Sequence, residues 1–297
     1  MPGAGKVVVV GDAGLDVVAR HDGPIVHGGD TRSQVRLTGG GAGANTALWL
    51  RAAGAEPTLL ARIGDDAPGR LLRSELEATG VTCAFAVDDE EPTCCVVVLV
   101  DTDGQRSMLP DRGANKRFRP SDVDRAVLAG ARHLHVSGYV LLDPSSRPAG
   151  LAALEAARAA GLTTSVDPQA ASLITDPAAF LDDVRGVDLL LPNAAELRAL
   201  TGDADPASAR ALLDTVGAVV VTTGLDGAAW VDGDGIRTVP AESAPCVDST
   251  GAGDAFNAGL LAAVLRGESI EDSLLAGVRL GARVVSQVGA QPVLSGR

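Results

Sequence analysis

The segment Val247–Phe256 reads VDSTGAGDAF and is the most informative stretch of the chain. Apolar residues then recur at helical spacing: Phe256, Leu260, Leu261, Val264 and Leu265. This pattern places Asp254 at the start of a helix, where an Asp often serves only as a cap. Gly251, Ala252 and Gly253, however, leave successive backbone N–H groups open to an anion, beside a carboxylate that can accept a proton. The segment therefore predicts phosphoryl transfer, with Asp254 as general base and residues 251–253 as the anion hole.

Upstream, short apolar runs alternate with alanine-rich stretches. The runs, each typical of a buried strand, are Val7–Val10, Thr58–Ile63, His133–Val136, Thr163–Val166, Val187–Leu191 and Ala218–Thr222. The expected helices are Ala44–Ala53, Gly69–Ala78, Ala149–Ala160, Ala194–Thr201, Ala207–Val216, Ala255–Leu265 and Ile270–Val285. Strand alternating with helix predicts an α/β fold with a central, mostly parallel sheet. Because the sequence shows no linker or repeat, we expect residues 1–297 to form a single domain.

Two segments break the alternation. Leu15–Thr38 is rich in Gly, charge and β-branched residues and has no helical period. Thr93–Pro110 is typical of two strands joined at a turn, Asp101–Gly104. Extra antiparallel strands on a parallel sheet suggest a β lid or a dimer surface, which we expect from about residues 14–38 and 92–114.

Three further segments combine a turn with the start of a helix or strand. Thr38–Asn45 (TGGGAGAN) can bring backbone close to a ligand, or it can be a plain flexible turn. Leu191–Leu197 (LPNAAEL) fits a capping box between Asn193 and Glu196, or a Glu196 that contacts Mg²⁺ through water. Val221–Gly227 (VTTGLDG), taken alone, predicts no more than a turn. The GxxxxGK[ST] signature is absent, which disfavours a P-loop NTPase.

Composition excludes several classes of protein. The net charge is −13 and no basic block occurs, which disfavours nucleic-acid binding because phosphates attract cationic surfaces. The longest apolar runs fall well short of the roughly 20 residues of a membrane-spanning helix. The four cysteines form no CxxC pair, so neither a disulfide framework nor a zinc site is indicated. With no signal-peptide core at the start, we expect a cytoplasmic protein.

The order of these segments resembles that of the ribokinase-like carbohydrate kinases, often called the PfkB family. The resemblance runs from Val7 to about Pro292 and is carried by Asp16, Gly40–Asn45, Asn193 with Glu196, Thr222–Gly227 and Asp248–Asp254. It implies a ribokinase-like three-layer fold with a small β lid that closes over the sugar and often forms a homodimer contact. The implied activity is transfer of the γ-phosphate of ATP, with Mg²⁺, to a primary hydroxyl of a small sugar.

The resemblance also implies a role for each matching residue. Asp254 would be the catalytic base, with the amides of Gly251, Ala252 and Gly253 as the anion hole. The sugar would contact Asp16, Gly40, Gly41, Asn45 and Arg112, and ATP would contact Asn193, Thr222, Thr223, Gly224 and Gly227. Glu196 would hold Mg²⁺ through water. Asp248 and Thr250 match positions that in some members surround a monovalent cation such as K⁺, or they simply brace the turn.

Two departures from the family pattern leave the acceptor open. Ala42 stands where ribokinases usually carry a Lys, which argues against ribose. Neither lid segment contains an aromatic residue, whereas nucleoside kinases of this family tend to stack the base on lid aromatics. Arg112, before a Gly-Ala-Asn turn, is instead suited to a carboxylate or phosphate. The alternatives are an acidic sugar of the 2-keto-3-deoxygluconate type, a sugar phosphate, a nucleoside, or a regulator that binds sugar or nucleotide without catalysis.

Overall fold

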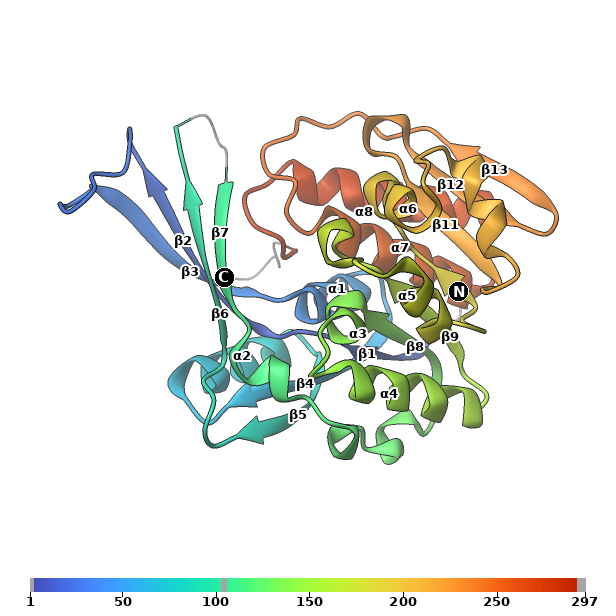
Figure 1. The fold of residues 1–297 in the computed structure, drawn as a ribbon, viewed down its shortest axis with the longest axis horizontal. Helices are drawn as coiled ribbons and strands as arrows, with labels where there is room; N and C mark the ends of the chain where they lie inside the picture. Colours follow the sequence, from blue (N-terminus) through green and yellow to red (C-terminus); the bar gives the residue numbers. More distant parts are fainter. Residues whose placement is uncertain (1–2, 103–105, 293–297) are drawn as a thin grey trace.

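A central sheet of nine strands runs through the larger part of the molecule in the computed structural model, which describes residues 3–102 and 106–292 (Figure 1). The sheet order is β13-β12-β11-β10-β9-β8-β1-β4-β5. Its strands are β1 (Lys6–Val10), β4 (Glu56–Gly64), β5 (Thr82–Asp88), β8 (Ala131–Ser137), β9 (Thr163–Asp167), β10 (Leu189–Leu190), β11 (Ala218–Thr222), β12 (Ala228–Asp232) and β13 (Gly235–Val239). From β5 to β11 the strands are parallel, whereas β12 and β13 are antiparallel additions at one edge. The predicted α/β fold is confirmed.

Helices cover both faces of this sheet and divide the interior into two cores. One core is shared by α1 (Ala42–Ala52), α2 (Ala67–Ala78), α7 (Ala252–Arg266) and α8 (Ile270–Val285). The other is shared by α3 (Gly138–Leu142), α4 (Arg147–Ala159), α5 (Pro177–Asp183) and α6 (Ala194–Thr201). In β1, Val7 and Val9 face the first core and Val8 and Val10 the second. An all-valine strand is therefore buried completely, because successive side chains enter opposite cores.

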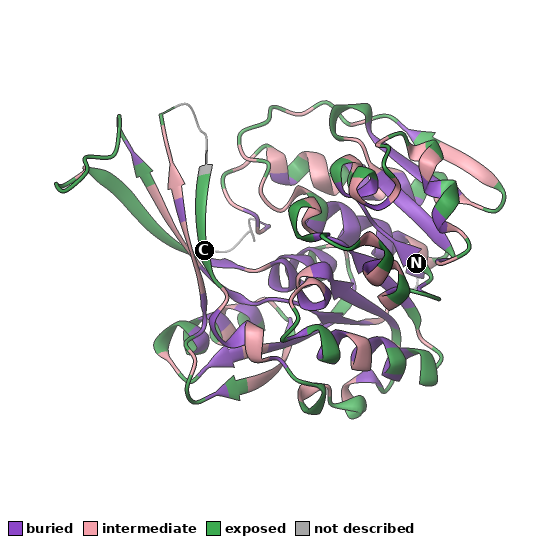
Figure 2. Ribbon diagram, viewed as in Figure 1, coloured by how far each residue is buried: buried purple, intermediate pink, exposed green. Residues whose placement is uncertain are grey.

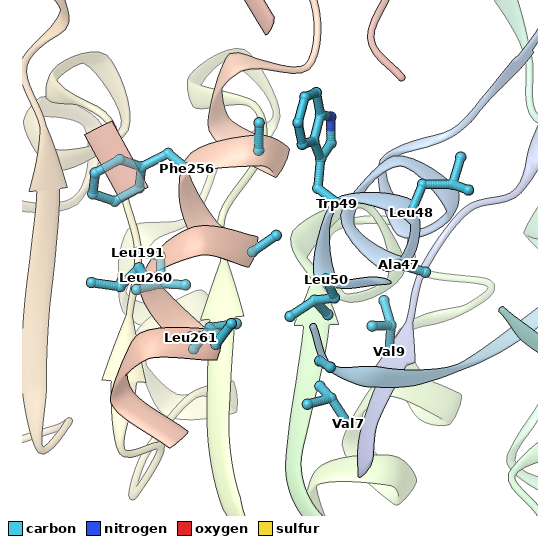
Figure 3. Packing of buried hydrophobic residues seen from close by; sticks show 14 of the residues in the cluster. Val7, Val9, Ala47, Leu48, Trp49, Leu50, Leu191, Phe256, Leu260 and Leu261 are labelled. Carbon is cyan, nitrogen blue, oxygen red and sulfur yellow. The ribbon is translucent and has the colours of Figure 1, made fainter. Parts of the chain in front are cut away.

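Helices α1 and α7 pack side by side, and this contact positions the site described below. Figure 3 shows α1, which carries Trp49 and Leu50, beside α7, which carries Leu260 and Leu261, with Val9 of β1 below Ala47 of α1. Since both helices begin at the same end of the sheet, residues from their first turns meet.

A second sheet of four strands projects from the main body (Figure 1). Its order is β3-β2-β6-β7, with β2 (Gly14–His21), β3 (Ser33–Gly40), β6 (Cys94–Val100) and β7 (Arg106–Asp111). Much of its surface is exposed, in contrast to the buried central sheet (Figure 2). The β lid expected from the sequence is thus present. The turn expected at Asp101–Gly104 falls partly outside the described residues.

Three local expectations were wrong in detail. The helix expected at Ala207–Val216 is a 3₁₀ helix, Pro206–Leu212, because its backbone makes the tighter i→i+3 hydrogen bonds. The strand expected at Val187–Leu191 is shorter, Leu189–Leu190, because the N–H of Val187 donates to the carbonyl oxygen of Val184 in a turn. Helix α7 begins at Ala252, so Asp254 lies inside the first turn rather than at the cap position, which Gly251 occupies. Among the described residues, no helix has the length and apolarity to cross a membrane.

Two histidines on β8 are fully enclosed in the sheet. His133 contacts Thr163 Oγ1 and Ser165 Oγ, each at 2.8 Å, and His135 Nδ1 contacts the same Ser165 hydroxyl at 2.8 Å. Burial lowers the pKa of both imidazoles to about 3, from an ordinary value of 6.5. Both side chains are therefore neutral in the folded protein.

These histidines predict a loss of stability in acid. Between pH 6.5 and pH 4.5 the unfolded chain binds protons that the folded chain does not. The free energy of unfolding therefore decreases as the pH is lowered through this range. Each buried His contributes about 1.4 kcal/mol per pH unit to that fall. We expect His135→Gln to reduce the slope by about this amount in denaturant titrations. Equal slopes for wild type and His135→Gln would contradict the prediction.

Candidate active site

The carboxylate of Asp254 is the centre of the site. It lies in the first turn of α7, is almost fully buried, and makes no helix-capping bond. Its Oδ2 accepts from Asn45 Nδ2 at 3.2 Å, and its Oδ1 accepts from Thr46 Oγ1 and Gln169 Nε2, each at 3.4 Å. Two of these donors belong to the first turns of α1. The structure therefore orients this carboxylate with side chains far away in the sequence.

Burial raises the pKa of Asp254 to about 6, and the hydrogen bonds from Asn45, Gln169 and Thr46 oppose that rise. A carboxyl group with a pKa near 6 is ionised at neutral pH, yet it accepts a proton more readily than an exposed Asp. This is the property expected of a general base.

A pocket of about 170 Å³ borders Asp254. Of the residues predicted from the sequence, Asn193, Glu196, Thr222, Gly251, Ala252, Gly253 and Asp254 line it. Five others line it as well: Asp167, Gln169, Leu191, Ser249 and Asn257. The first N–H groups of a helix have no partner within the helix and favour negative charge. The start of α7 thus gives this pocket one wall suited to an anion.

Two glycines make this arrangement possible. Gly251 precedes α7 with φ of 76°, and a Cβ there would lie 2.7 Å from the Cβ of Ala290. Gly41 precedes α1 with φ of 93°, and a Cβ there would lie 2.5 Å from the carbonyl oxygen of Asp12. Any other residue would have to adopt a rare backbone conformation and push these segments apart.

The C-terminal turn holds the two helix starts from outside. The indole Nε1 of Trp49, on α1, donates to the carbonyl oxygen of Ala290 at 2.8 Å. Gln291 Nε2 donates to Asn45 Oδ1 at 3.5 Å. Both residues therefore contact α1, and Ala290 also lies against Gly251 at the start of α7.

Asn193 and Glu196 form the capping box of α6. Asn193 Oδ1 accepts from the N–H of Glu196 at 2.9 Å, and Glu196 Oε2 accepts from the N–H of Asn193 at 2.9 Å. Glu196 Oε1 also accepts from Asn193 Nδ2 at 2.6 Å. Since both carboxylate oxygens of Glu196 are engaged, this donor set fits a contact with Mg²⁺ through water rather than direct ligation. Within residues 3–102 and 106–292, no group of three His, Cys, Asp or Glu residues is arranged to hold a metal.

Three acidic side chains share the pocket. Burial, together with the negative charges of Glu196 and Asp254, holds the pKa of Asp167 well above its ordinary value. Burial likewise raises the pKa of Glu196. Asp167 accepts from Asn257 Nδ2 at 2.6 Å and from the N–H of Gln169 at 2.8 Å. The pocket thus concentrates carboxyl groups beside a helix start that attracts anions.

Asp16 and Arg112 lie toward the lid. The carboxylate of Asp16, on β2, rests against Gly40 of β3, and burial raises the pKa of Asp16 to about 6. Arg112 donates from Nε and Nη2 to the two carboxylate oxygens of Asp12 at 3.0 and 2.8 Å, and from Nη1 to Asp143. An anionic group of a substrate would have to compete with these carboxylates for Arg112.

The remaining predicted residues lie in two turns. Asp248 accepts from the N–H of Thr250 at 2.8 Å and from the N–H of Gly289 at 2.9 Å, so its side chain braces the turn before α7. Thr223 donates to the carbonyl oxygen of Gly227 from both N–H and Oγ1, at 2.9 and 3.0 Å. That turn, which includes Gly224, follows Thr222 and therefore adjoins the pocket.

Some of the missed residues had a signal in the sequence. Asp12 and Asp167 each stand close after a buried strand run, where polar residues of a parallel sheet gather at one edge. Asn257 lies three residues after Asp254 and so shares its helix face. Gln169, by contrast, follows Pro168 in a segment without a recognisable pattern.

The fold is α/β, and the start of α7 gives one pocket both free N–H groups and a buried carboxylate, an arrangement suited to phosphoryl transfer. Comparison with known proteins identifies the family. Residues 4–295 match the pfkB family of carbohydrate kinases, and the chain belongs to that family. It is an ATP-dependent carbohydrate kinase.

The relatives differ in the acceptor that their names give. The chain is 31% identical over 289 residues to an ATP-dependent ribose-1-phosphate kinase of Halopiger xanaduensis, covering 96% of this chain and 94% of that one. It is 32% identical to a fructokinase of Klebsiella pneumoniae, covering 92% and 88%. The crystal structure of an adenosine kinase from Sinorhizobium meliloti superposes with a TM-score of 0.88 at 26% identity, covering 98% of this chain and 96% of that one.

The contacts of Arg112 predict a measurable loss of stability when it is replaced. Its ion pair with Asp12 is mostly buried, with side chains 19% and 11% exposed. In Arg112→Met the carboxylates of Asp12 and Asp143 lose their counter-charge, and we expect the free energy of unfolding to fall by about 2–4 kcal/mol. In Arg70→Met, whose partner Asp65 is well exposed, the fall should be about 0–1 kcal/mol. Denaturant titration measures both, and equal losses would contradict the prediction.

Proposed function

We propose that this kinase transfers the γ-phosphate of ATP to a primary hydroxyl of a small sugar, and that Asp254 accepts the hydroxyl proton. The observation that carries the proposal is the Asp254 carboxylate, buried beside the pocket and held by Asn45 and Thr46. A carboxylate fixed in this way can orient an acceptor hydroxyl and take its proton as the oxygen attacks phosphorus.

The sugar and ATP would approach this carboxylate from opposite sides. We assign the sugar to the lid side, with Asp16, Gly40, Gly41 and Asn45, and Arg112 as a further contact. ATP would lie along Asn193, Thr222 and the turn at Thr223, Gly224 and Gly227. In the transfer the hydroxyl O–H bond breaks toward Asp254, the new O–P bond forms, and the β,γ-bridging oxygen leaves with ADP. Negative charge on the moving phosphoryl group would face the amides of Gly251, Ala252 and Gly253.

Mg²⁺, bound with ATP, supplies positive charge to the phosphates. Glu196 would hold its water ligands with the lone pairs that the capping box leaves free on its two carboxylate oxygens. Closure of the lid would exclude water, which would otherwise accept the phosphoryl group. The K⁺ site at Asp248 and Thr250, and the cytoplasmic location, stay predictions from the sequence.

A sugar phosphate is the second candidate acceptor. Arg36 of β3 is exposed and lies opposite Val18 of β2 in the lid sheet. Two residues along the same two strands, Thr38 lies opposite Asp16. Residues two apart share a face of a sheet, so Arg36 lies on the face that carries Asp16. A guanidinium there could hold a phosphate at the far end of a sugar, and one relative is named as a ribose-1-phosphate kinase.

The opposite face of the lid supports a homodimer. Leu37, Val17, Val97 and Leu109 form one continuous row across its four strands. Leu37 and Leu109 are 63% and 59% exposed, and Val35 beside them is 59% exposed. A continuous apolar face of this kind is typical of a protein interface. Since an apolar sheet face is complementary to itself about a two-fold axis, we propose that a second copy of the chain covers it.

The test of function is ADP release with MgATP against a panel of acceptors. The panel contains ribose, fructose, 2-keto-3-deoxygluconate, ribose 1-phosphate, fructose 6-phosphate, adenosine and pseudouridine. We expect activity with a sugar or sugar phosphate. In Asp254→Asn, turnover should fall roughly 10²–10⁴-fold because the base is lost, while ATP affinity stays within about twofold.

Asp214→Asn, at an exposed position, is the matched control and should keep full turnover. Wild-type turnover in Asp254→Asn would exclude the assigned base. Activity confined to adenosine or pseudouridine would replace the sugar by a nucleoside, and activity confined to 2-keto-3-deoxygluconate would indicate an acidic sugar.

The proposed lid interface predicts that a charge placed in it converts the dimer to a monomer, which lowers the mass of the sedimenting species. Leu37→Asp places a charge in the centre of the apolar face, and we expect the dimer to dissociate at least tenfold more readily in sedimentation experiments. Leu225→Asp, an equal change at a 95% exposed residue outside the lid, should leave the dimer intact. A wild-type protein that sediments as a monomer would refute the dimer.

A further inference from the structure

Gln169 has an unusual backbone. Its φ is 68°, and among the described residues it is the only one other than glycine with positive φ. Side chains with a Cβ rarely adopt this conformation, and where they do the surrounding contacts must hold them in it. Gln169 follows Pro168 directly after β9, at the edge of the sheet where the pocket lies.

The contacts of Gln169 show what this backbone conformation achieves. The N–H of Gln169 donates to Asp167 Oδ1 at 2.8 Å, and its carboxamide Nε2 donates to Asp167 Oδ2 at 2.9 Å. The same Nε2 donates to Asp254 Oδ1 at 3.4 Å. A carboxamide nitrogen carries two hydrogens, so one amide group links the two carboxylates.

These contacts close a ring between β9 and α7. Asp167 ends β9, and its Oδ2 also accepts from Asn257 Nδ2, which lies on α7 three residues after Asp254. Gln169 completes the ring by contacting Asp254 itself. Two carboxylates this close repel one another, and donors between them reduce that repulsion.

We propose that Gln169 is a positioning residue of this kinase, whose carboxamide links Asp167 and Asp254 and holds Asp254 toward the acceptor hydroxyl. The proposal rests on the proposed role of Asp254 as base. Gln169 acts through Asp254, and its left-handed backbone aims the carboxamide at both carboxylates.

The alternative is a purely structural role, in which Gln169 only completes the turn after β9. The two roles differ in one measurable property. A structural residue affects folding and the fraction of active protein, whereas a residue that donates to the base changes the pH at which the base becomes protonated.

The test compares pH profiles of kcat/KM for the acceptor, using the substrate found with the panel. Gln169→Met keeps the length of the side chain and removes its donors. The carboxylate of Asp254 then loses one donor, so its pKa rises from about 6. We expect the acidic limb of the profile to move up by roughly half to one pH unit, and kcat at pH 7 to fall about tenfold.

Three further variants separate the possible causes. Gln169→Gly removes the carboxamide and relieves the backbone, so it should fold at least as stably as wild type while its acidic limb moves as in Gln169→Met. Thr46→Val removes another donor to Asp254 and should move the limb in the same direction. Asn257→Leu removes a donor from Asp167 alone and should move it less.

The proposal would be overturned if the acidic limb of the pH profile is unchanged in both Gln169 variants and these variants, properly folded, keep wild-type turnover. A limb that moves only in variants with a lowered melting temperature would also overturn it. Failure of the base assignment is a separate result, because it appears as full turnover in Asp254→Asn. A shifted limb in Gln169→Gly together with an inactive Asp254→Asn supports both.

Discussion

The burial of one carboxylate between two helix starts is the constraint on which the site depends. Asp254 has almost no contact with water, and a charged group in that situation requires donors of its own. Asn45 and Thr46 supply two of them, and both are on α1. The packing of α1 against α7, with Trp49 and Leu260 in the shared core, therefore determines where this carboxylate points.

The pocket is acidic although its expected ligand is a polyphosphate. Asp167, Glu196 and Asp254 all have raised pKa values, with burial as the main cause. Each of these carboxyl groups has hydrogen-bond donors of its own: the amide of Gln169 for Asp167, the capping box for Glu196, and the side chains of α1 for Asp254. In the proposed function, the amides of α7 and the Mg²⁺ bound with ATP then meet the phosphates. That division would let the proposed base and the proposed anion site lie side by side.

The sequence predicts regular elements and the strongest motif well, because both depend on local pattern. An all-valine run buried on both faces can hardly be anything but an inner strand, and VDSTGAGDAF leaves few alternatives for the start of α7. Contacts between distant segments are harder to predict. Nothing near Gln169 predicts that its backbone turns left-handed or that its amide reaches a carboxylate 85 positions away. The two acidic partners of Arg112 likewise come from distant segments, Asp12 after β1 and Asp143 after α3.

The contacts of Ala290 have a consequence for how the protein is made. Trp49 and Gly251 both rest against this residue, and Gln291 contacts Asn45. A ribosome adds residues in order, so every strand of the central sheet is synthesised before the segment that secures α1 and α7. The nascent chain can thus form its sheet early, but it acquires a fully braced pocket only after residues 290 and 291 have left the ribosome.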